Sequence, residues 1–399
     1  MKPLEGIKVL DLSRVLAGPW CTQLLADLGA EVMKIERPGH GDDTRHWGPP
    51  WLGEGDERVA AYFLSCNRGK KSAAIDFGQP EGAALVRKLA ERADIVVENF
   101  KVGGLEKFGL DAKSLRTANP RLIYASITGF GQDGPYSDRA GYDYIIQGMG
   151  GLMSITGLPD GEPGGGPMRV GVAVVDLFTG LYTCVAILSA LYRREKTNEG
   201  AHIDMALFDT QIAMLANQAS NELISGKDPP RQGNTHPNIV PYQPFEAADQ
   251  PIIIAIGNDR QFGRLADICG HGEWATDERF GSNEARVAHR NEMVQLVSDA
   301  IRQKPASVWL EQLERSGIPA GPINRISQAL NDVQAQHRQM VRSIAGISLI
   351  GSPVRLDGAR ADSDLPPPSL GEHTDTVLRE VGLEIGQIEQ LEADGVIGR

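Results

Sequence analysis

Cysteine is scarce in this sequence, and no cysteine pattern indicates a metal site. The four cysteines, Cys21, Cys66, Cys184 and Cys269, lie far apart, with no C-x-x-C pair and no histidine at a zinc-ligand spacing. We therefore expect neither a disulfide framework nor a structural metal ion.

The sequence also lacks long apolar runs and an excess of basic residues. No stretch approaches the roughly 18 uninterrupted apolar residues of a membrane span, and residues 1–6 lack the apolar segment of a secretion signal. The net charge of −12 disfavours nucleic acid or an anionic membrane as a partner. We expect a cytoplasmic enzyme that acts on small molecules, and 399 residues favour two domains.

The common catalytic signatures are absent as well. There is no G-x-x-x-x-G-K-[ST] phosphate loop, no G-x-S-x-G elbow and no H-E-x-x-H zinc helix. Glu36 ends a predicted strand, where a dinucleotide-binding fold places its ribose-binding acid, so an NAD-dependent dehydrogenase is one alternative. The turn after the first strand carries only Gly18 and lacks the G-x-G-x-x-G spacing, which speaks against it.

Strand-like and helix-like segments alternate along the first third of the chain. The patterns predict strands at 7–12, 31–36, 72–76, 94–98 and 122–127, and helices at 19–28 and 79–92. Such alternation indicates an α/β fold with a parallel sheet, in which ligands bind at the carboxyl ends of the strands.

The amino-acid composition of the sequence changes near residue 226. Residues 226–237 are rich in Gly, Pro and polar side chains, as linkers are. Beyond them the patterns predict a strand at 251–256 and helices at 260–268 and 284–302, with an exit at 317–322. Prolines at 366–368 precede a predicted helix at 374–381. We interpret the middle part as a second, smaller domain.

One acidic residue stands out in the first half. Residues 169–175 form an apolar, strand-like run that ends at Asp176, and a helix-like stretch follows at 177–192. A carboxylate at a helix N-terminus is favoured by free backbone N–H groups and by the helix dipole. Asp176 is thus either a helix N-cap, the commoner role of such a residue, or a carboxylate nucleophile.

Several blocks in a fixed order give the sequence a family resemblance. It resembles the class III coenzyme A transferases, which include formyl-CoA transferase, carnitine-CoA transferase and α-methylacyl-CoA racemase. The match runs from about residue 4 to the C-terminus and is carried by residues 12–19, 29–38, 67–72, 98–100 and 129–135 and by the Asp176 segment.

The resemblance implies both an architecture and a mechanism. It implies a large Rossmann-like domain from residues 1–225 and 326–399, a smaller α+β domain at 226–325, and a homodimer whose chains interlock. Asp176 would be the catalytic carboxylate, holding first an acyl group and then CoA. Acyl-CoA and carboxylic acids would be the substrates, with no tightly bound cofactor.

Positions that match the family's motifs give the candidate binding residues. For coenzyme A these are Val15, Arg37, Ile75, Asn99, Phe100, Lys107 and Arg139. For the acyl substrate they are Leu16, Ala17, Gly257 and Asn258. A dicarboxylate also needs a cation or hydrogen-bond donors for its distal carboxylate, and the candidates in nearby loops are Arg45, Tyr62, Tyr142, His46 and Arg68. Gly257 and Asn258 match a mobile glycine-containing loop, although this chain has fewer glycines there. For most of these residues a core or surface role is the alternative.

Departures from the family motifs narrow the substrate. Tyr142 stands where the racemase branch has a histidine base, and tyrosine, with an ordinary pKa of about 10, replaces it poorly. Leu16 stands where formyl-CoA transferase carries a glutamine that helps hold oxalate. The similarity is greatest to transferases that move CoA from succinyl-CoA to C4–C5 dicarboxylates such as glutarate or itaconate. Oxalate-type and carnitine-type transferases and the racemase remain alternatives, as does a catalytically idle CoA-binding protein.

Overall fold

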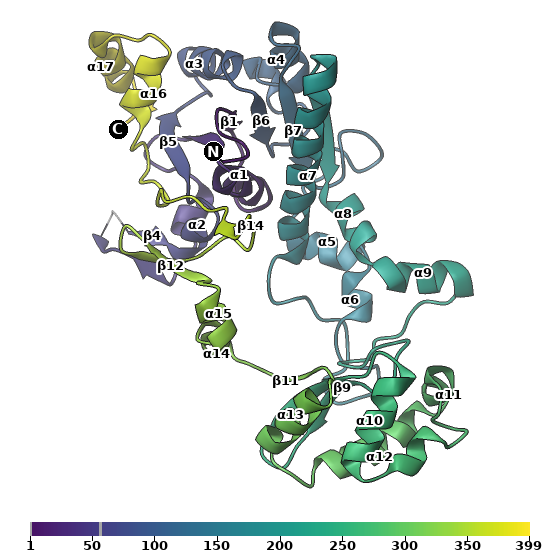
Figure 1. Ribbon diagram of the computed structural model, residues 1–399. Coiled ribbons are helices and arrows are strands. Elements are labelled where there is room, and N and C mark those ends of the chain that lie inside the picture. The colour runs from purple at the N-terminus through teal and green to yellow at the C-terminus, as the bar shows by residue number, and fades with distance from the viewer. Residues whose placement is uncertain (1, 56–57) are drawn as a thin grey trace. The chain divides into compact units, whose positions relative to one another are not determined.

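The chain folds into two compact units. The computed structural model describes residues 2–55 and 58–399 (Figure 1). Residues up to Leu152, together with Arg169–Gly226 and Val333–Arg399, form the first unit, and Met153–Met168 with Lys227–Asp332 form the second. The sequence patterns did not indicate that Met153–Met168 belongs with the second unit.

A seven-stranded sheet forms the centre of the first unit. Its order is β16-β5-β2-β1-β6-β7-β8, and every neighbouring pair is parallel except β16 with β5. The strands are β1 (Lys8–Asp11), β2 (Glu31–Glu36), β5 (Lys70–Ile75), β6 (Ile95–Glu98), β7 (Ile123–Thr128), β8 (Ala201–Ala206) and β16 (Ile397–Gly398). The expected α/β fold with a mainly parallel sheet is confirmed.

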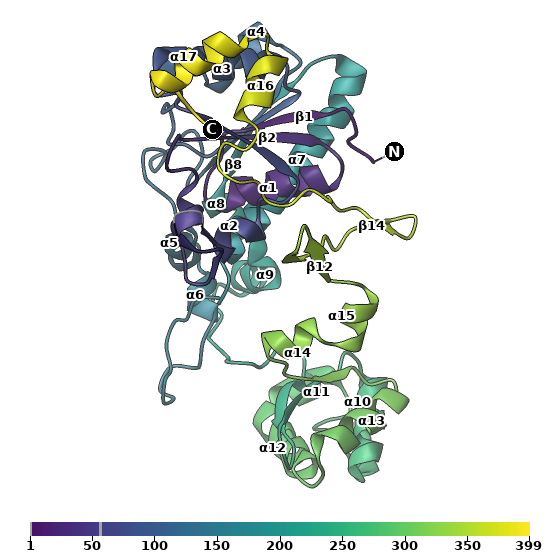
Figure 2. The same ribbon diagram turned by 90° about the vertical axis from the view of Figure 1, so that its left-hand side faces the viewer.

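Helices cover both faces of this sheet (Figure 2). Successive side chains of a strand point to opposite faces, so Val96 enters one apolar core and Val97 the other. The first core lies under α3 (Pro80–Glu91), α4 (Ala112–Ala118), α16 (Thr374–Glu380) and α17 (Ile385–Ala393). The second lies under α1 (Ala17–Asp27), α5 (Asp143–Met149), α7 (Val174–Thr197) and α8 (Leu207–Met214).

Shorter elements complete the first unit. They are η1 (Asp43–His46), β3 (Trp51–Leu52), β4 (Val59–Ala60), α2 (Ala61–Ser65), η3 (Glu106–Phe108), α9 (Ala216–Ser225), α15 (Val333–His337), β12 (Val341–Ile344), β13 (Ile347–Ile350), β14 (Arg355–Leu356) and β15 (Ala359–Arg360). The short helix α6 (Leu152–Ile155) lies at the boundary between the units.

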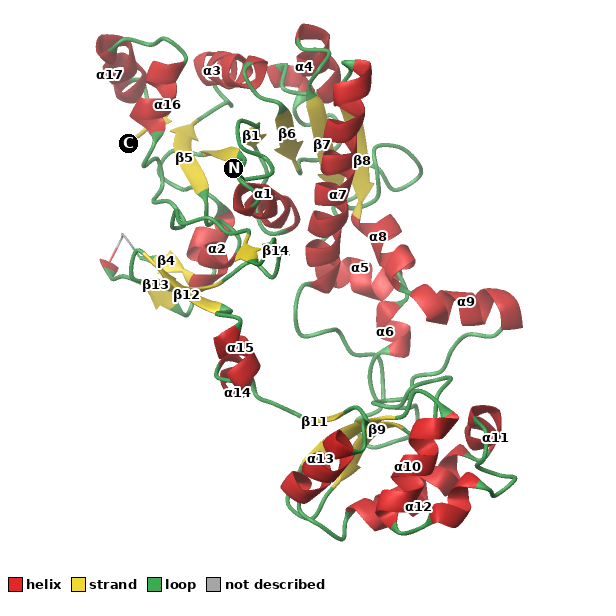
Figure 3. Ribbon diagram, in the orientation of Figure 1, coloured by secondary structure: helices red, strands yellow, loops and turns green. Residues whose placement is uncertain are grey.

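The second unit packs helices on a small antiparallel sheet (Figure 3). Its strands are β9 (Tyr242–Glu246), β10 (Pro251–Ala255) and β11 (Ala320–Pro322), and its helices are α10 (Asp259–Cys269), η4 (Gly272–Ala275), α11 (Asn283–Ala288), α12 (Arg290–Ile301), α13 (Ala306–Arg315) and α14 (Ile326–Leu330). Trp309, Phe262 and Phe280 are buried in its core. The single helix predicted at 284–302 is wrong, because the backbone of His289 leaves the helical region (φ −109°, ψ 31°) and separates α11 from α12.

The strand-like run before Asp176 is not a strand. No strand is assigned to residues 169–173, and α7 begins at Val174. β8 already pairs with the free side of β7, and the N–H of Val170 donates to the Gln147 side chain instead of to a neighbouring strand. Among the described residues α7 alone is long and apolar enough to pass a test for membrane-spanning helices, but one side of it is buried against α1 in the second core, as core helices are.

Candidate active site

Asp176 lines a cavity of about 430 Å³ at the carboxyl ends of β1, β6, β7 and β8. The cavity is bounded by the loops that follow these strands and by the first turn of α7. The predicted residues that line it with Asp176 are Val15, Leu16, Ala17, Asn99, Phe100, Arg139 and Tyr142. The structure therefore gathers these residues from four distant parts of the sequence at the sheet edge where a ligand was expected.

The loop after β1 is held in an unusual conformation. Val15 has φ +71°, in the left-handed region that a β-branched residue rarely adopts. Its N–H donates to the Asp42 carboxylate at 3.3 Å. The Asn99 side chain brackets Arg14, accepting from its N–H at 2.8 Å and donating to its carbonyl at 2.7 Å. Asn99, predicted to bind the nucleotide, thus fixes this loop through both ends of its amide.

Two buried ion pairs stabilise the same loop. The Lys34 ammonium contacts Asp42 at 2.9 Å and donates to the Ser13 carbonyl at 2.7 Å, while Lys70 contacts Asp11 at 3.0 Å. Burial opposes ionisation of Asp42, but the Lys34 charge and the hydrogen bonds from Lys34 and Thr44 together outweigh it and lower the pKa of that carboxyl to about 2. Sequence analysis missed this network; the only available signal was a lysine inside the otherwise buried strand β2.

A close backbone contact between Gly129 and Gly141 shapes another wall of the cavity. A Cβ at Gly141 would lie 2.3 Å from the Cα of Gly129, and a Cβ at Gly129 would lie 2.5 Å from the Cα of Gly141. Only glycine allows this backbone contact. It fixes the segment that carries Tyr142 and Asp143 beside the end of β7.

The structure decides between cap and free carboxylate for Asp176. Asp176 lies in the first turn of α7, and the helix cap comes from another helix: the Asp143 carboxylate accepts from the N–H groups of Val175 at 2.8 Å and of Asp176 at 3.4 Å. In the described part of the chain the Asp176 carboxylate has no hydrogen-bond or ion-pair partner. Burial, with the Asp143 charge second, raises the pKa of Asp176 to about 7.

A second cavity of about 330 Å³ adjoins the first and shares Arg14 and Phe100 with it. It brings together the predicted CoA residues Arg37, Ile75 and Phe100. Lys107 lines neither of these cavities and lies over the Phe108 ring.

Arg45 and Arg68 are engaged in ion pairs. Arg45 forms a two-pronged pair with buried Glu36 at 2.7 and 2.8 Å, and Arg68 contacts Asp27 and Asp362. Neither lines the cavity at Asp176.

Two further substrate candidates stand on separate elements of the first unit. Tyr62 on α2 is not among the residues that line the Asp176 cavity, and its ring meets Trp47 edge-on with 5.3 Å between the ring centroids. Burial, with the Asp176 charge second, raises the pKa of its phenol to about 12. His46 on η1 contacts the His40 carbonyl at 2.8 Å.

Gly257 and Asn258 belong to the second unit. Asn258 caps α10, its side-chain oxygen accepting from the Gln261 N–H at 3.0 Å, and the Gly257 N–H donates to the Gln261 side chain at 2.7 Å. Their closure over Asp176 stays a prediction.

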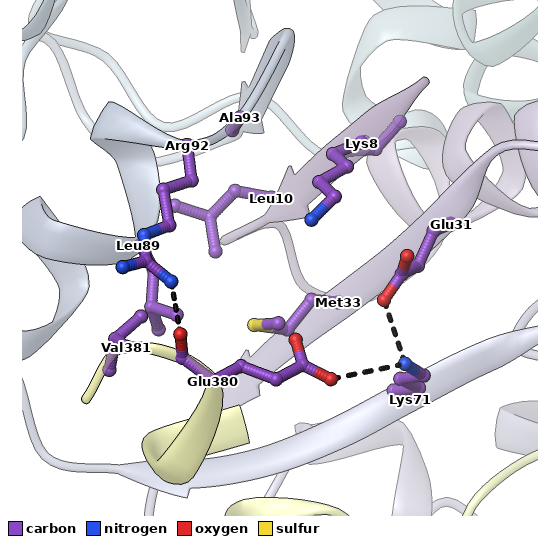
Figure 4. Close-up of a pocket in the computed structure, with 11 residues that line it drawn as sticks. Lys8, Leu10, Glu31, Met33, Lys71, Leu89, Arg92, Ala93, Glu380 and Val381 are labelled. Carbon is purple, nitrogen blue, oxygen red and sulfur yellow. Dashed lines mark hydrogen bonds and ion pairs between the residues drawn. The ribbon is translucent and has the colours of Figure 1, made fainter. Parts of the chain in front are cut away.

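A third cavity, of about 340 Å³, lies at the amino ends of β1 and β2, the opposite edge of the sheet (Figure 4). Among its lining residues, Lys71 contacts Glu31 at 2.7 Å and Glu380 at 3.9 Å, and Arg92 donates to the Glu380 carbonyl. Its charges are mostly paired with one another and are remote from Asp176. Across residues 2–55 and 58–399, no cluster of three or more His, Cys, Asp or Glu side chains could hold a metal ion.

Comparison with known proteins identifies the family of this chain. Residues 4–374 match CoA-transferase family III. The chain is 51% identical to succinate–glutarate CoA-transferase of Agrobacterium fabrum, over 95% of this chain and 96% of that protein, and 42% identical to human succinyl-CoA:glutarate CoA-transferase, over 96% and 86%. A crystal structure of a CAIB/BAIF family protein from Brucella suis, 51% identical, superposes with a TM-score of 0.84 and covers 95% of this chain and 99% of that one. The chain therefore belongs to CoA-transferase family III and is a CoA-transferase.

Proposed function

We propose that this enzyme moves CoA from succinyl-CoA to a C4–C5 dicarboxylate, such as glutarate or itaconate, through covalent intermediates on Asp176. The observation that carries the proposal is the Asp176 carboxylate itself. It faces the cavity at the carboxyl edge of the sheet, and neither capping nor an ion pair within the described residues occupies it.

The reaction divides into four displacements at carbonyl carbon. An Asp176 oxygen attacks the thioester carbon of succinyl-CoA; the C–S bond breaks, leaving a succinyl–aspartyl anhydride and CoA thiolate. The thiolate attacks the aspartyl carbonyl and releases succinate, giving an aspartyl–CoA thioester. The acceptor carboxylate then displaces the thiolate to form a second anhydride. The thiolate attacks its acceptor carbonyl, which yields the new acyl-CoA and regenerates the Asp176 carboxylate with no net proton consumed.

The two adjoining cavities provide room for coenzyme A and for the acyl group. Arg37, Ile75 and Phe100 would contact the nucleotide end, with a cation for phosphate and apolar surfaces for adenine. Val15, Leu16 and Ala17 would line the thioester end beside Asp176. Lys107 lines neither cavity, so we assign it no direct contact with coenzyme A.

A dicarboxylate also needs a partner for its distal carboxylate. Arg14, Lys101 and Arg139 are the cations among the residues that line the Asp176 cavity. Because Arg45 is held by Glu36 and Arg14 pairs with Asp43, we favour Arg139 for this contact, with Tyr142 beside it. The names of the relatives, succinate–glutarate and succinyl-CoA:glutarate CoA-transferase, support the substrate class.

The family resemblance also leads us to propose an interlocked homodimer with a Rossmann-like large domain, in the cytoplasm. In that assembly the loop with Gly257 and Asn258 would supply N–H groups to the oxyanion of each tetrahedral intermediate, for which the Gly257 N–H must leave the Gln261 side chain. Sedimentation of the purified protein tests the dimer directly.

The test of function is a CoA-exchange assay with succinyl-CoA and a panel of glutarate, itaconate, malate, citramalate, oxalate and carnitine. Hydroxylamine is added in parallel, since it converts an aspartyl thioester or anhydride to a hydroxamate that peptide mass spectrometry locates. We expect a C4–C5 dicarboxylate to react fastest and the hydroxamate to form at Asp176.

Two variants complete this assay. Asp176→Ala should abolish exchange, whereas Asp133→Ala, which removes an exposed carboxylate, should retain it. Preference for oxalate or carnitine would replace the proposed substrate class with the alternatives named above. Full activity of Asp176→Ala would overturn the mechanism.

A further inference from the structure

Asp143 and Gln147 on α5 clamp the segment that carries Asp176. One oxygen of Asp143 accepts from the N–H groups of Val175 and Asp176, and the other accepts from the Gln147 amide at 2.7 Å. The opposite end of that amide accepts from the Val170 N–H at 2.9 Å. Both side chains are buried, so this arrangement is part of the folded core of the site.

We propose that Asp143 is a positioning residue for the transfer reaction: it fixes the first turn of α7 and places a second negative charge beside the Asp176 carboxylate. The inference rests on the proposed role of Asp176 as nucleophile. It assigns Asp143 a purpose beyond capping, because an uncharged oxygen acceptor would cap the helix equally well.

The second charge alters the balance between free and covalent enzyme. Two neighbouring carboxylates repel each other when both are ionised. Asp176 loses its charge when it becomes an anhydride or a thioester, so each covalent intermediate relieves that repulsion. Asp143 therefore disfavours the free carboxylate relative to the intermediates. It also makes Asp176 more basic, which strengthens it as a nucleophile.

Other charged or titratable groups face Asp176 from several elements. Arg14, Lys101 and Arg139 line its cavity from the loops after β1, β6 and β7, and the Asp176 charge contributes to the raised pKa of Tyr62 on α2. Burial and then Asp143 are the causes that raise the pKa of Asp176 to about 7. Burial remains when Asp143 is neutralised, so part of the elevation should persist.

The experiment compares Asp143→Asn, which removes the charge, with Gln147→Leu, which weakens the clamp but keeps both carboxylates. The acidic limb of kcat/KM is measured from pH 5 to 9 with succinyl-CoA and the fastest acceptor. Hydroxamate formed at Asp176 after addition of succinyl-CoA alone gives the covalent fraction.

Removing the charge should lower the pKa of Asp176 and move the acidic limb of Asp143→Asn to lower pH by about one unit, with about tenfold less covalent enzyme. Gln147→Leu should lower kcat without moving the limb. If the acidic limb of kcat/KM for Asp143→Asn lies at the same pH as in wild type, the inference is overturned. Asp143 would then be only a helix cap, whose charge has no effect on Asp176.

If Asp143→Asn fails to fold, Asp143→Ser retains a short capping oxygen without the charge and takes its place. If Asp176→Ala remains active, Asp176 is not the nucleophile and the proposed function itself is wrong. If Asp176→Ala is inactive but the acidic limb of Asp143→Asn does not move, only the inference about Asp143 is wrong.

Discussion

Lys34 and Asp42 form a 2.9 Å ion pair in which neither side chain is more than 1% exposed. The pair joins β2 to the loop after β1, since Lys34 also donates to the Ser13 carbonyl and Asp42 also accepts from the Val15 N–H. A buried pair contributes little net stability, but removing one partner leaves an uncompensated charge. The strained active-site loop thus depends on two buried charges, Lys34 and Asp42, which also line the second cavity.

Replacing Lys34 with methionine should lower the free energy of unfolding by about 3–5 kcal/mol, because Asp42 would remain buried without its cation. Chemical denaturation measures this change. Lys71→Met is the matched control: Lys71 on β5 pairs with Glu31 on β2 but is 27% exposed, so its replacement should cost under about 1 kcal/mol. Equal losses in the two variants would contradict the role given to burial.

The same pair predicts a dependence on acid. Asp42 has a folded-state pKa of about 2, below its unfolded value, so its stabilisation is complete above about pH 4 and is lost as the pH falls through 2. Wild type should therefore exceed Asp42→Asn in stability at pH 6, and the difference should shrink steadily between pH 4 and 2. Denaturation at several pH values tests this, and a difference independent of pH would refute it.

Arg45 should behave as a structural residue. Its two hydrogen bonds to buried Glu36 match the guanidinium fork, which lysine cannot reproduce. We expect Arg45→Lys to lower the unfolding free energy by about 2 kcal/mol, without selectively raising KM for the acceptor. Arg139→Ala should instead raise that KM with little effect on stability. The reverse pattern would restore Arg45 as the substrate contact.

Much of the fold follows from local patterns. The strand at 31–36 was predicted at its observed bounds, and the helices at 19–28 and 79–92 differ from α1 and α3 by one or two residues at each end. Apolar periodicity and end signals determine such elements directly. β16 could not be found this way, because it has two residues and exists only through pairing with β5.

The site was predictable only in part. Residues that follow strand ends, such as Val15 and Asn99, could be placed because parallel strands end at one edge. The roles of Asp143 and Lys34 depend on contacts across 32 and 8 residues of sequence, respectively, as the hydrogen bond to Val175 and the pair with Asp42 show. No local pattern reports such contacts. Burial likewise separates Arg45 from Arg139, although both are arginines in loop-like sequence.

Gly141→Ala tests the backbone contact that shapes the cavity. The added Cβ would meet the Cα of Gly129 at 2.3 Å, and backbone atoms cannot move aside as a flexible side chain can. We expect a loss of about 1–3 kcal/mol and a drop in activity larger than the loss of folded enzyme explains. Gly386→Ala on α17, where nothing lies within 4 Å, should raise the melting temperature slightly and retain activity. Similar behaviour of both variants would contradict the contact.

Asp176 should cost stability when it is ionised. Its folded-state pKa of about 7 lies above the unfolded value, so its favourable contribution is complete below about pH 4 and disappears as the pH rises through 7. Asp176→Asn, which removes the charge, should therefore be more stable than wild type at pH 8, by roughly 1–2 kcal/mol once solvent contact with the partly exposed side chain is considered. At pH 4 the two proteins should unfold alike.

This stability difference is linked to activity because the ionised form that destabilises the fold is also the proposed nucleophile. Exchange by wild type should fall by half near pH 7 and continue to fall in acid, while Asp176→Asn should be inactive throughout. Asp133→Asn, which changes an exposed carboxylate, should shift neither curve. A variant that is inactive yet no more stable at pH 8 would mean that Asp176 pays no electrostatic penalty in the free enzyme, and the repulsion assigned to Asp143 would then have to be abandoned.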